Sequence, residues 1–227
     1  MRLRVTFSKS GPLTYTSHLD LARAWERALR RAGIPLAYSG GFNPRPKLQL
    51  AAALPLGHTG EAELLDVWLE GPIPVEDFTR ALVPLLPDGL TISQVRRVML
   101  REPALQTRVV AAEYRVTVEW DELADAVEAR IERVLGATEL LYERRGRRYD
   151  LRPLIERLWL ERCPEPRRRA VEGRAAVGEV ALGMQLAARA GATARPEVVL
   201  DALGMGGAFA CYRRVRLIGV SGVDLYA

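Results

Sequence analysis

The sequence predicts an α+β protein built from two tandem ferredoxin-like halves. Strand and helix patterns follow the order βαββαβ over about the first 95 residues, which is the ferredoxin-like unit. A polar stretch that contains a proline follows at 101–108, and the same order of elements then recurs. The length of 227 residues suits two small domains of about 100 residues each. We therefore predict a first half at 1–100, a linker at 101–108 and a second half at 109–227.

The first half opens with a strand and a helix. Polar Arg2, Arg4 and Thr6 alternate with three apolar residues, which predicts a half-buried strand. Ser17 lies three residues before Asp20, a variant of the capping box, and predicts the start of a helix. A glycine and then a proline end the helical pattern near residue 33.

Four more elements complete this half. The predicted elements are strands at 48–56 and 63–70, a helix at 74–86 and a strand at 90–98. The two central strands flank a Gly-His-Thr-Gly turn, in which we expect His58 to be solvated.

The second half repeats this order with weaker signals. The predicted elements are a strand at 112–120, a helix at 121–135, strands at 139–143, 149–160 and 173–188, a helix at 196–203 and a strand at 210–220. Gly178 and Gly183 weaken the strand pattern in which they lie, because glycine is uncommon inside strands.

Composition narrows the functional classes. The net charge of +5 and the pI near 9.5 permit a nucleic-acid partner without requiring one. No apolar run approaches the ~20 residues of a membrane-spanning helix, and the first residues lack the apolar segment of a signal peptide. We therefore expect a cytoplasmic protein without membrane contact.

Cysteine and histidine usage excludes several kinds of site on this chain alone. Cys163 and Cys211 are far apart in sequence, without the spacing of a zinc knuckle or an iron–sulfur cluster. His18 and His58 are the only histidines, so a three-histidine metal site is excluded. Phosphate-loop, dinucleotide-binding and nucleophile-elbow motifs do not occur either. We predict no metal and no cofactor on this chain, and whether it catalyses a reaction stays open.

One segment stands out for nucleic-acid chemistry, residues 38–47 with the sequence YSGGFNPRPK. Its two glycines allow close backbone approach, and its prolines stiffen the chain around Arg45 and Lys47. Arginine and lysine bind phosphates, while Tyr38 and Phe42 are able to stack on unpaired bases. Lys47 is one of only two lysines among 33 basic residues. The alternative is a stiff connector whose aromatic rings fill the core.

Further arginines extend the predicted RNA surface. One face of the first predicted helix carries Arg23, Arg27 and Arg30. A second basic group lies at a predicted hairpin tip and consists of Arg144, Arg145, Arg147 and Arg148. Such groups give salt-dependent binding to phosphates, and the alternative for each is an ordinary solvated surface.

His18 is the one candidate for catalysis. It lies at the start of the first predicted helix, where the helix dipole disfavours the charged imidazolium. A neutral imidazole near Tyr38 and Lys47 would suit a metal-independent RNA-cleaving enzyme. The alternative is a histidine that simply hydrogen-bonds at a helix start.

Several segments together resemble the radical-SAM-associated (radical-SAM-linked) domain of unknown function. Its motifs match here as FSK at 7–9, SHLD at 17–20, RRAGIPLAYS at 30–39, GFNPRPK at 41–47, LPLG at 54–57 and, more loosely, YDLRPL at 149–154 and TARPE at 193–197. The resemblance implies a chain that occurs fused behind, or encoded beside, a radical-SAM protein with a cobalamin-type domain. It also implies gene neighbours that include ribonuclease E/G and ribosomal-protein genes, which points to RNA maturation or modification. Catalytic residues are not established for this family, so none are transferred.

These observations lead to three functional hypotheses. The first is an RNA-binding accessory protein that presents tRNA or rRNA to a separate radical-SAM enzyme, with Tyr38, Phe42, Arg45 and Lys47 as the primary contact. The second is a module whose basic faces dock on an acidic surface of the radical-SAM partner without RNA contact. The third is a metal-independent endoribonuclease that uses His18, with Lys47 as the group that stabilises phosphate charge.

Overall fold

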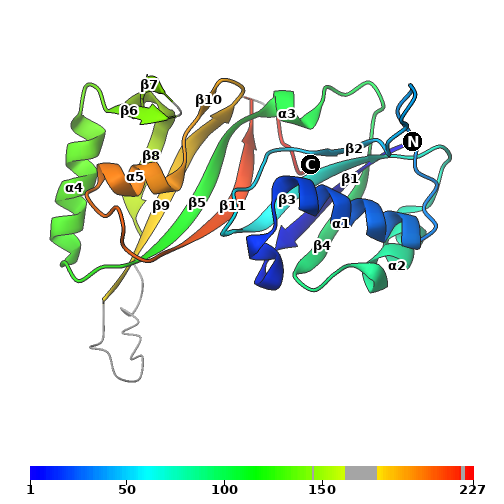
Figure 1. Ribbon diagram of the computed structural model, residues 1–227, viewed down its shortest axis with the longest axis horizontal. Helices are drawn as coiled ribbons and strands as arrows, with labels where there is room; N and C mark the ends of the chain where they lie inside the picture. The colour runs from blue at the N-terminus through cyan, green and yellow to red at the C-terminus, as the bar shows by residue number, and fades with distance from the viewer. Residues whose placement is uncertain (145, 162–177, 221–222) are drawn as a thin grey trace. The chain divides into compact units, whose positions relative to one another are not determined.

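The computed structural model describes residues 1–144, 146–161, 178–220 and 223–227 (Figure 1). The protein is α+β, as the sequence predicts. The helices are α1 (His18–Arg31), α2 (Val75–Leu82), α3 (Leu105–Arg108), α4 (Ala124–Gly136) and α5 (Pro196–Ala202). The strands are β1 (Arg2–Lys9), β2 (Leu48–Leu50), β3 (His58–Trp68), β4 (Leu90–Val98), β5 (Val109–Glu119), β6 (Leu141–Arg144), β7 (Arg147–Asp150), β8 (Ile155–Leu160), β9 (Glu179–Arg189), β10 (Ala192–Thr193) and β11 (Ala210–Gly219).

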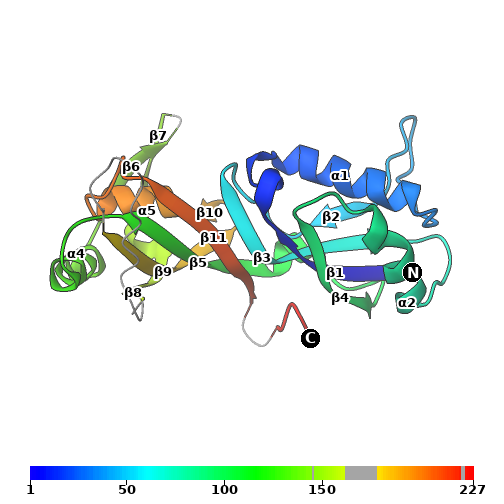
Figure 2. The same cartoon turned by 90° about the horizontal axis from the view of Figure 1, so that it is seen from below.

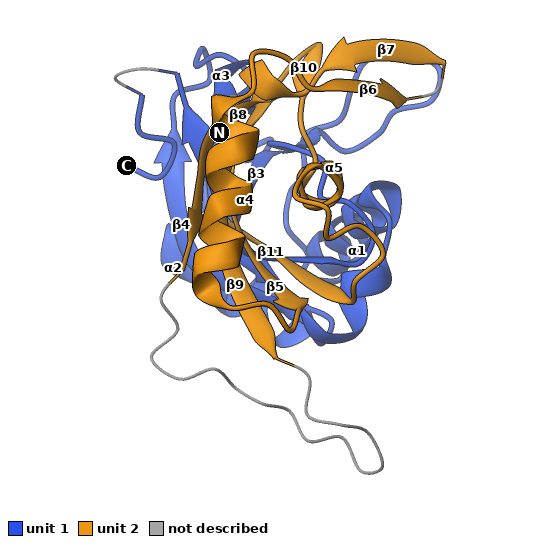
Figure 3. Cartoon of the chain, turned by 90° about the vertical axis from the view of Figure 1, so that its left-hand side faces the viewer, with its two compact units in different colours: residues 1–109, 216–227 blue, residues 110–215 orange. Residues whose placement is uncertain are grey.

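The chain divides into two compact units (Figure 3). Unit 1 consists of residues 1–109 and 216–227, and unit 2 consists of residues 110–215. Strand β11 contributes residues to both units. Residues 101–108, which the sequence predicts to be a linker, belong to unit 1, where they include α3 and its buried Leu105.

Unit 1 contains the predicted βαββαβ order of elements. Strands β2, β3, β1 and β4 are neighbours in that order, and each adjacent pair is antiparallel. Strand β4 has the predicted bounds, whereas β2 is much shorter than the strand predicted at 48–56. His58 is the first residue of β3 and is buried, so its predicted exposure to solvent is wrong. The reason is that β3 extends further toward the turn than the apolar pattern indicates.

The core of unit 1 forms between β1 and the two helices that pack on its apolar face (Figure 2). Leu3, Val5 and Phe7 all lie on this face because successive side chains of a strand alternate. The residues of α1 that meet them are spaced four apart, and they are Leu21, Trp25 and Leu29. Helix α2 adds Phe78 and Leu82. The Phe7 and Trp25 rings meet edge to face, with centroids 4.9 Å apart.

Unit 2 is centred on the long antiparallel pair β5–β9. Strands β8 and β10 both pair with β9, while β6 and β7 form a separate two-stranded hairpin. Gly183 lies opposite Trp159 of β8, and a Cβ at this position would overlap the Trp159 indole. Glycine is therefore required inside this strand by close packing. Residues 173–177 of the strand predicted at 173–188 lie outside the described residues.

The structure does not show two separate ferredoxin-like halves. The described strands hydrogen-bond in the order β10-β9-β5-β11-β3-β1-β4, with β2 attached to β3 and β8 attached to β9, as one nine-stranded sheet. The sequence predicts local element order, but strand-to-strand hydrogen bonding depends on which backbone edges are left unpaired.

Candidate nucleic-acid interface

Residues 38–47 form a braced loop that leads into β2. The backbone of Lys47 bonds to that of Ala37, and Tyr38 pairs with Pro46. Ser39 and Arg45 bond twice, because the Ser39 N–H donates to the Arg45 carbonyl (2.8 Å) and the Arg45 N–H donates to the Ser39 hydroxyl (3.0 Å). The tip consists of residues 40–44, where Gly41 has a φ of 112° that side chains rarely adopt. The loop is therefore held by hydrogen bonds on both sides of its tip.

The four predicted contact residues of this loop all face solvent. Phe42 is fully exposed at the tip, and Tyr38, Arg45 and Lys47 are exposed as well. Within the described part of the chain, the Arg45 and Lys47 side chains have no ion-pair partner. The alternative of a connector whose rings fill the core is wrong, because neither ring is buried. The loop presents two aromatic faces and two uncompensated cations.

The arginine face of α1 adjoins this loop. Arg23, Arg27 and Arg30 are exposed and follow the spacing i, i+4, i+7 of a single helical face. The Arg30 guanidinium lies 5.8 Å from the centre of the Tyr38 ring, a cation–π contact that links the last turn of α1 to the loop. Exposed ion pairs hold Arg23 to Asp20 (3.2 Å) and Arg30 to a glutamate one turn earlier (2.9 Å). Such pairs are weak, so phosphates are able to replace them.

His18 lies at the opposite end of α1 from the loop. It is the first helical residue, while the contact with Tyr38 is made by Arg30 twelve residues later. A rise of 1.5 Å per residue separates the two positions by about 18 Å. Most of the length of α1 therefore lies between His18 and the residue that contacts Tyr38, and catalysis by His18 with Lys47 stays a prediction.

The second predicted basic group belongs to unit 2. Arg144 pairs with Arg147 across the β6–β7 hairpin, and Gly146 in the turn has a φ of 74°. Arg144 and Arg147 line a pocket of about 340 Å³ together with Tyr149 and the turn before β10. Arg148 lies 3.9 Å from Glu143 and is exposed, whereas Arg145 is outside the described residues. This hairpin carries exposed cations, as predicted, and its contact with RNA stays a prediction.

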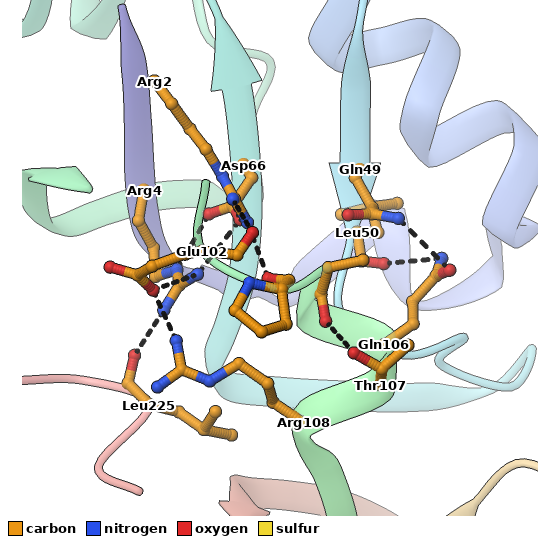
Figure 4. A network of polar contacts seen from close by, with 12 residues as sticks. Arg2, Arg4, Gln49, Leu50, Asp66, Glu102, Gln106, Thr107, Arg108 and Leu225 are labelled. Carbon is orange, nitrogen blue, oxygen red and sulfur yellow. Dashed lines mark hydrogen bonds and ion pairs between the residues drawn. The ribbon is translucent and has the colours of Figure 1, made fainter. Parts of the chain in front are cut away.

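The arginines of β1 have a different environment from the one predicted. Arg2 and Arg4 are each only 1% exposed, so both faces of β1 are buried. The prediction of a half-buried strand is therefore wrong. Both guanidiniums bond to the carboxylate of Asp66 on the neighbouring strand β3 (Figure 4). The Arg4 Nε donates to Asp66 Oδ1 over 2.8 Å. A buried charge requires a partner of this kind.

Segments near the end of unit 1 in sequence complete this network. Arg2 donates to the carbonyls of Glu102 and Pro103, and Arg4 and Arg96 donate to the carbonyl of Leu225. Burial, and next the charge of nearby Arg4, lowers the pKa of Arg96. The bonds of Arg4 alone join residues 62 and 221 positions apart. The network covers the polar face of β1, so its role is structural. The sequence feature that could have indicated this network is Asp66, an aspartate inside the apolar run of β3. A buried carboxylate at such a position needs a buried cation as its partner.

A small pocket lies between α1 and strands β2 and β3. Its apolar lining includes Trp25, Leu50 and Leu65, and its polar lining consists of His18, Gln49 and Gln106. The volume is about 180 Å³. Sequence reasoning missed this pocket because Gln49 and Gln106 are 57 residues apart and neither belongs to a motif.

Among the described residues, no helix is both long and apolar enough to cross a membrane. No three or more His, Cys, Asp or Glu side chains in the described part of the chain gather where they would hold a metal ion.

The chain belongs to a family of uncharacterised proteins conserved in bacteria, DUF2344, whose model matches residues 2–196. No curated protein matches the sequence.

Several solved structures have a distant likeness to this chain. They include the archaeal box H/ACA sRNP Nop10–Cbf5 complex (12% identity, TM-score 0.46, covering 95% of this chain and 47% of that one) and a Cbf5–Nop10–Gar1 complex (12%, 0.47, 95% and 48%). A third is an H/ACA RNP bound to a substrate RNA containing 2′-deoxyuridine (11%, 0.46, 93% and 47%). The chain spans about half the length of these solved chains.

Proposed function

We propose that this chain is an RNA-binding accessory protein that presents tRNA or rRNA to a separate radical-SAM enzyme. The observation that carries the RNA contact is the braced loop 38–47. On this loop Arg45 and Lys47 are exposed, without an ion pair to any described residue, beside two exposed aromatic rings. The radical-SAM partner rests on the sequence resemblance described above.

The chemistry of the loop suits single-stranded RNA better than a duplex. Aromatic rings stack on bases whose faces are free, and the Phe42 side chain is fully exposed. The cations neutralise phosphates on either side of a stacked base. The exposed arginines of α1 continue the charged surface from Tyr38 onward, through the contact with Arg30.

A filter-binding titration of tRNA and rRNA at several salt concentrations tests this proposal. The variant is Arg45→Ala combined with Lys47→Ala, and the matched control is Arg101→Ala combined with Arg133→Ala, which removes two exposed cations elsewhere. Each lost phosphate contact on single-stranded RNA lowers the slope of log affinity against log salt by about 0.7. We expect the slope to fall by about 1.4 in the loop variant and to change little in the control.

Equal slopes for the loop variant and the wild type would refute the RNA contact at this loop. Binding that is insensitive to salt in the wild type would refute it as well, because phosphate contacts release counterions.

A second function is favoured by one other observation, the exposed apolar side chains near the start of α1. Tyr15, Leu19 and Leu56 are each more than 60% exposed, and the turn after Leu56 bonds to Thr14. With the basic surfaces, this group would suit a module that docks on an acidic surface of the radical-SAM protein without RNA. Co-purification with that enzyme after nuclease treatment, with no RNA retained, would favour docking over RNA presentation.

A further inference from the structure

The pocket between α1, β2 and β3 has the size of a single flat ring system. Its volume of about 180 Å³ corresponds to about six water molecules in the liquid and lies below the range of pockets for drug-sized ligands. Leu50 and Leu65 are buried and supply apolar lining, and Ala22 leaves space on the side of the helix. An aromatic heterocycle combines the apolar faces and polar edges that such a lining accommodates.

The indole N–H of Trp25, a residue of the lining, has no hydrogen-bond partner among the described residues. Trp25 is completely buried, and its indole Nε1–H has no acceptor among the described residues. A buried tryptophan N–H nearly always has an acceptor, because burying it unbonded is costly. Trp25 lines the pocket, so an acceptor atom of a bound molecule is a suitable source of the missing bond.

The two glutamines form an ordered pair. The Gln106 Nε2 donates to the Leu50 carbonyl (3.1 Å), and the Gln49 Nε2 donates to the Gln106 Oε1 (3.3 Å). The Leu50 carbonyl only accepts, so it sets the orientation of the Gln106 amide, which in turn sets that of Gln49. Gln49 keeps its Oε1 acceptor and one N–H donor for a ligand. An amide acceptor beside an amide donor is the group that pairs with N6–H and N7 of adenine.

We propose that this pocket takes one unpaired adenine base of the bound RNA, with Gln49 as the residue that selects it. This inference rests on the proposed RNA binding and adds a base preference to it. Lys47 lies directly before β2 and two residues from Gln49, which is about 7 Å along a strand. Alternate residues of a strand point to the same side. A phosphate on Lys47 therefore places the attached nucleoside near the Gln49 amide.

The test compares two RNA heptamers, UUUAUUU and UUUUUUU, by fluorescence anisotropy. The variant is Gln49→Ala, and the matched control is Gln94→Ala, an exposed glutamine of β4 outside the pocket. We expect the wild type and the control to bind UUUAUUU at least about fivefold more tightly than UUUUUUU. This factor is the lower end of the discrimination that a bidentate amide–base contact gives. We expect Gln49→Ala to bind both heptamers equally.

Two results would overturn the adenine pocket while RNA binding stands. One is equal affinity of the wild type for the two heptamers, and the other is an adenine preference that survives in Gln49→Ala. The variant Arg45→Ala with Lys47→Ala separates the two proposals, since it should weaken the binding of both heptamers, whereas Gln49→Ala should remove only the difference between them.

If neither heptamer binds, the proposed function fails. Binding of a nucleobase in the pocket is then tested separately, by NMR titration with adenosine and with uridine. The indole N–H resonance of Trp25 is identified by elimination with Trp68→Phe, Trp120→Phe and Trp159→Phe. A shift with adenosine, weaker with uridine and lost in Gln49→Ala, sustains a nucleobase pocket. An unmoved Trp25 resonance in saturating adenosine refutes it and assigns the missing acceptor to water.

Discussion

Unit 1 contains two pairs of cations with the same charge and opposite environments. Arg2 and Arg4 of β1 are buried and share the Asp66 carboxylate, whereas Arg45 and Lys47 of the loop are exposed and form no ion pair within the described part of the chain. The first pair is compensated inside the protein and has no charge to offer a ligand. The second is the pair that a polyanion is able to reach. An arginine-rich sequence therefore does not locate a nucleic-acid surface by itself, because burial and pairing decide which cations bind.

The two pairs also differ in what their loss should do. A buried ion pair is costly to break, because removing one partner leaves a charge without compensation. An exposed cation contributes little to stability and more to association. Mutations in the two regions should therefore separate stability from RNA affinity.

The largest expected effect is that of Asp66→Asn on stability. The amide keeps the volume of the carboxylate but leaves Arg2 and Arg4 without an anion, so we expect a loss of about 3–5 kcal/mol in the free energy of unfolding. Urea unfolding followed by circular dichroism measures it. The control is Asp77→Asn, which removes an exposed pair with Arg80 and should cost less than about 1 kcal/mol. Similar unfolding free energies for the two variants would show that the buried network does not hold β1.

The next effect concerns the tip of the loop. Phe42→Ala should weaken the binding of single-stranded RNA by about 1–3 kcal/mol for each stacked base, without changing the unfolding midpoint. The control is Phe209→Ala, which removes an exposed phenylalanine in unit 2. Equal losses of affinity in both variants would mean that general apolar contact, not stacking on this loop, is being measured.

A smaller effect is expected at the start of the α1 arginine face. The Ser17 hydroxyl accepts a hydrogen bond from the backbone N–H of Asp20 (3.2 Å), so Ser17 is the N-cap of α1. Ser17→Ala should lower the free energy of unfolding by about 1 kcal/mol. Ser17→Asp keeps an N-cap acceptor and should recover most of that loss. An unchanged unfolding midpoint in Ser17→Ala would show that packing alone holds this end of the helix.

The smallest effect is a titration shift at Asp20. The hydrogen bond from the Ser17 hydroxyl, and after it the contact with Arg23, lowers the pKa of Asp20 below its ordinary value. Because the folded-state pKa is depressed, the stabilisation is present above the unfolded pKa and is lost as pH falls through the folded value. In an NMR titration, Ser17→Ala should raise the Asp20 pKa toward the ordinary value, and Arg23→Ala should raise it less. The opposite ranking would make Arg23 the main cause.

Much of the local structure could be predicted from the sequence because local interactions determine it. The bounds of β4, the N-cap at Ser17 and the proline at the first position of α5 all follow from residues within one turn or one strand. The exposure of Phe42 could be predicted less firmly, since an aromatic residue in a loop is equally able to fill a core.

The candidate site was only partly predictable, because some of its residues are neighbours in the sequence and others are far apart. The loop 38–47 is contiguous, and its composition identified it. The pocket between α1, β2 and β3 combines Gln49 with Gln106, and the environment of Arg2 depends on Asp66 and Glu102. These contacts span more than 50 residues, and no local pattern encodes them.

The sequence by itself determined the α+β class, most helix and strand positions and the stiff cationic loop, because backbone propensity, capping and side-chain alternation act between near neighbours. Only the tertiary structure decided which arginines are neutralised inside the protein. It also decided that β11 is a strand of a nine-stranded sheet and that two distant glutamines meet beside Trp25. Those outcomes depend on desolvation and on long-range pairing, and both arise only when segments far apart in the chain come into contact.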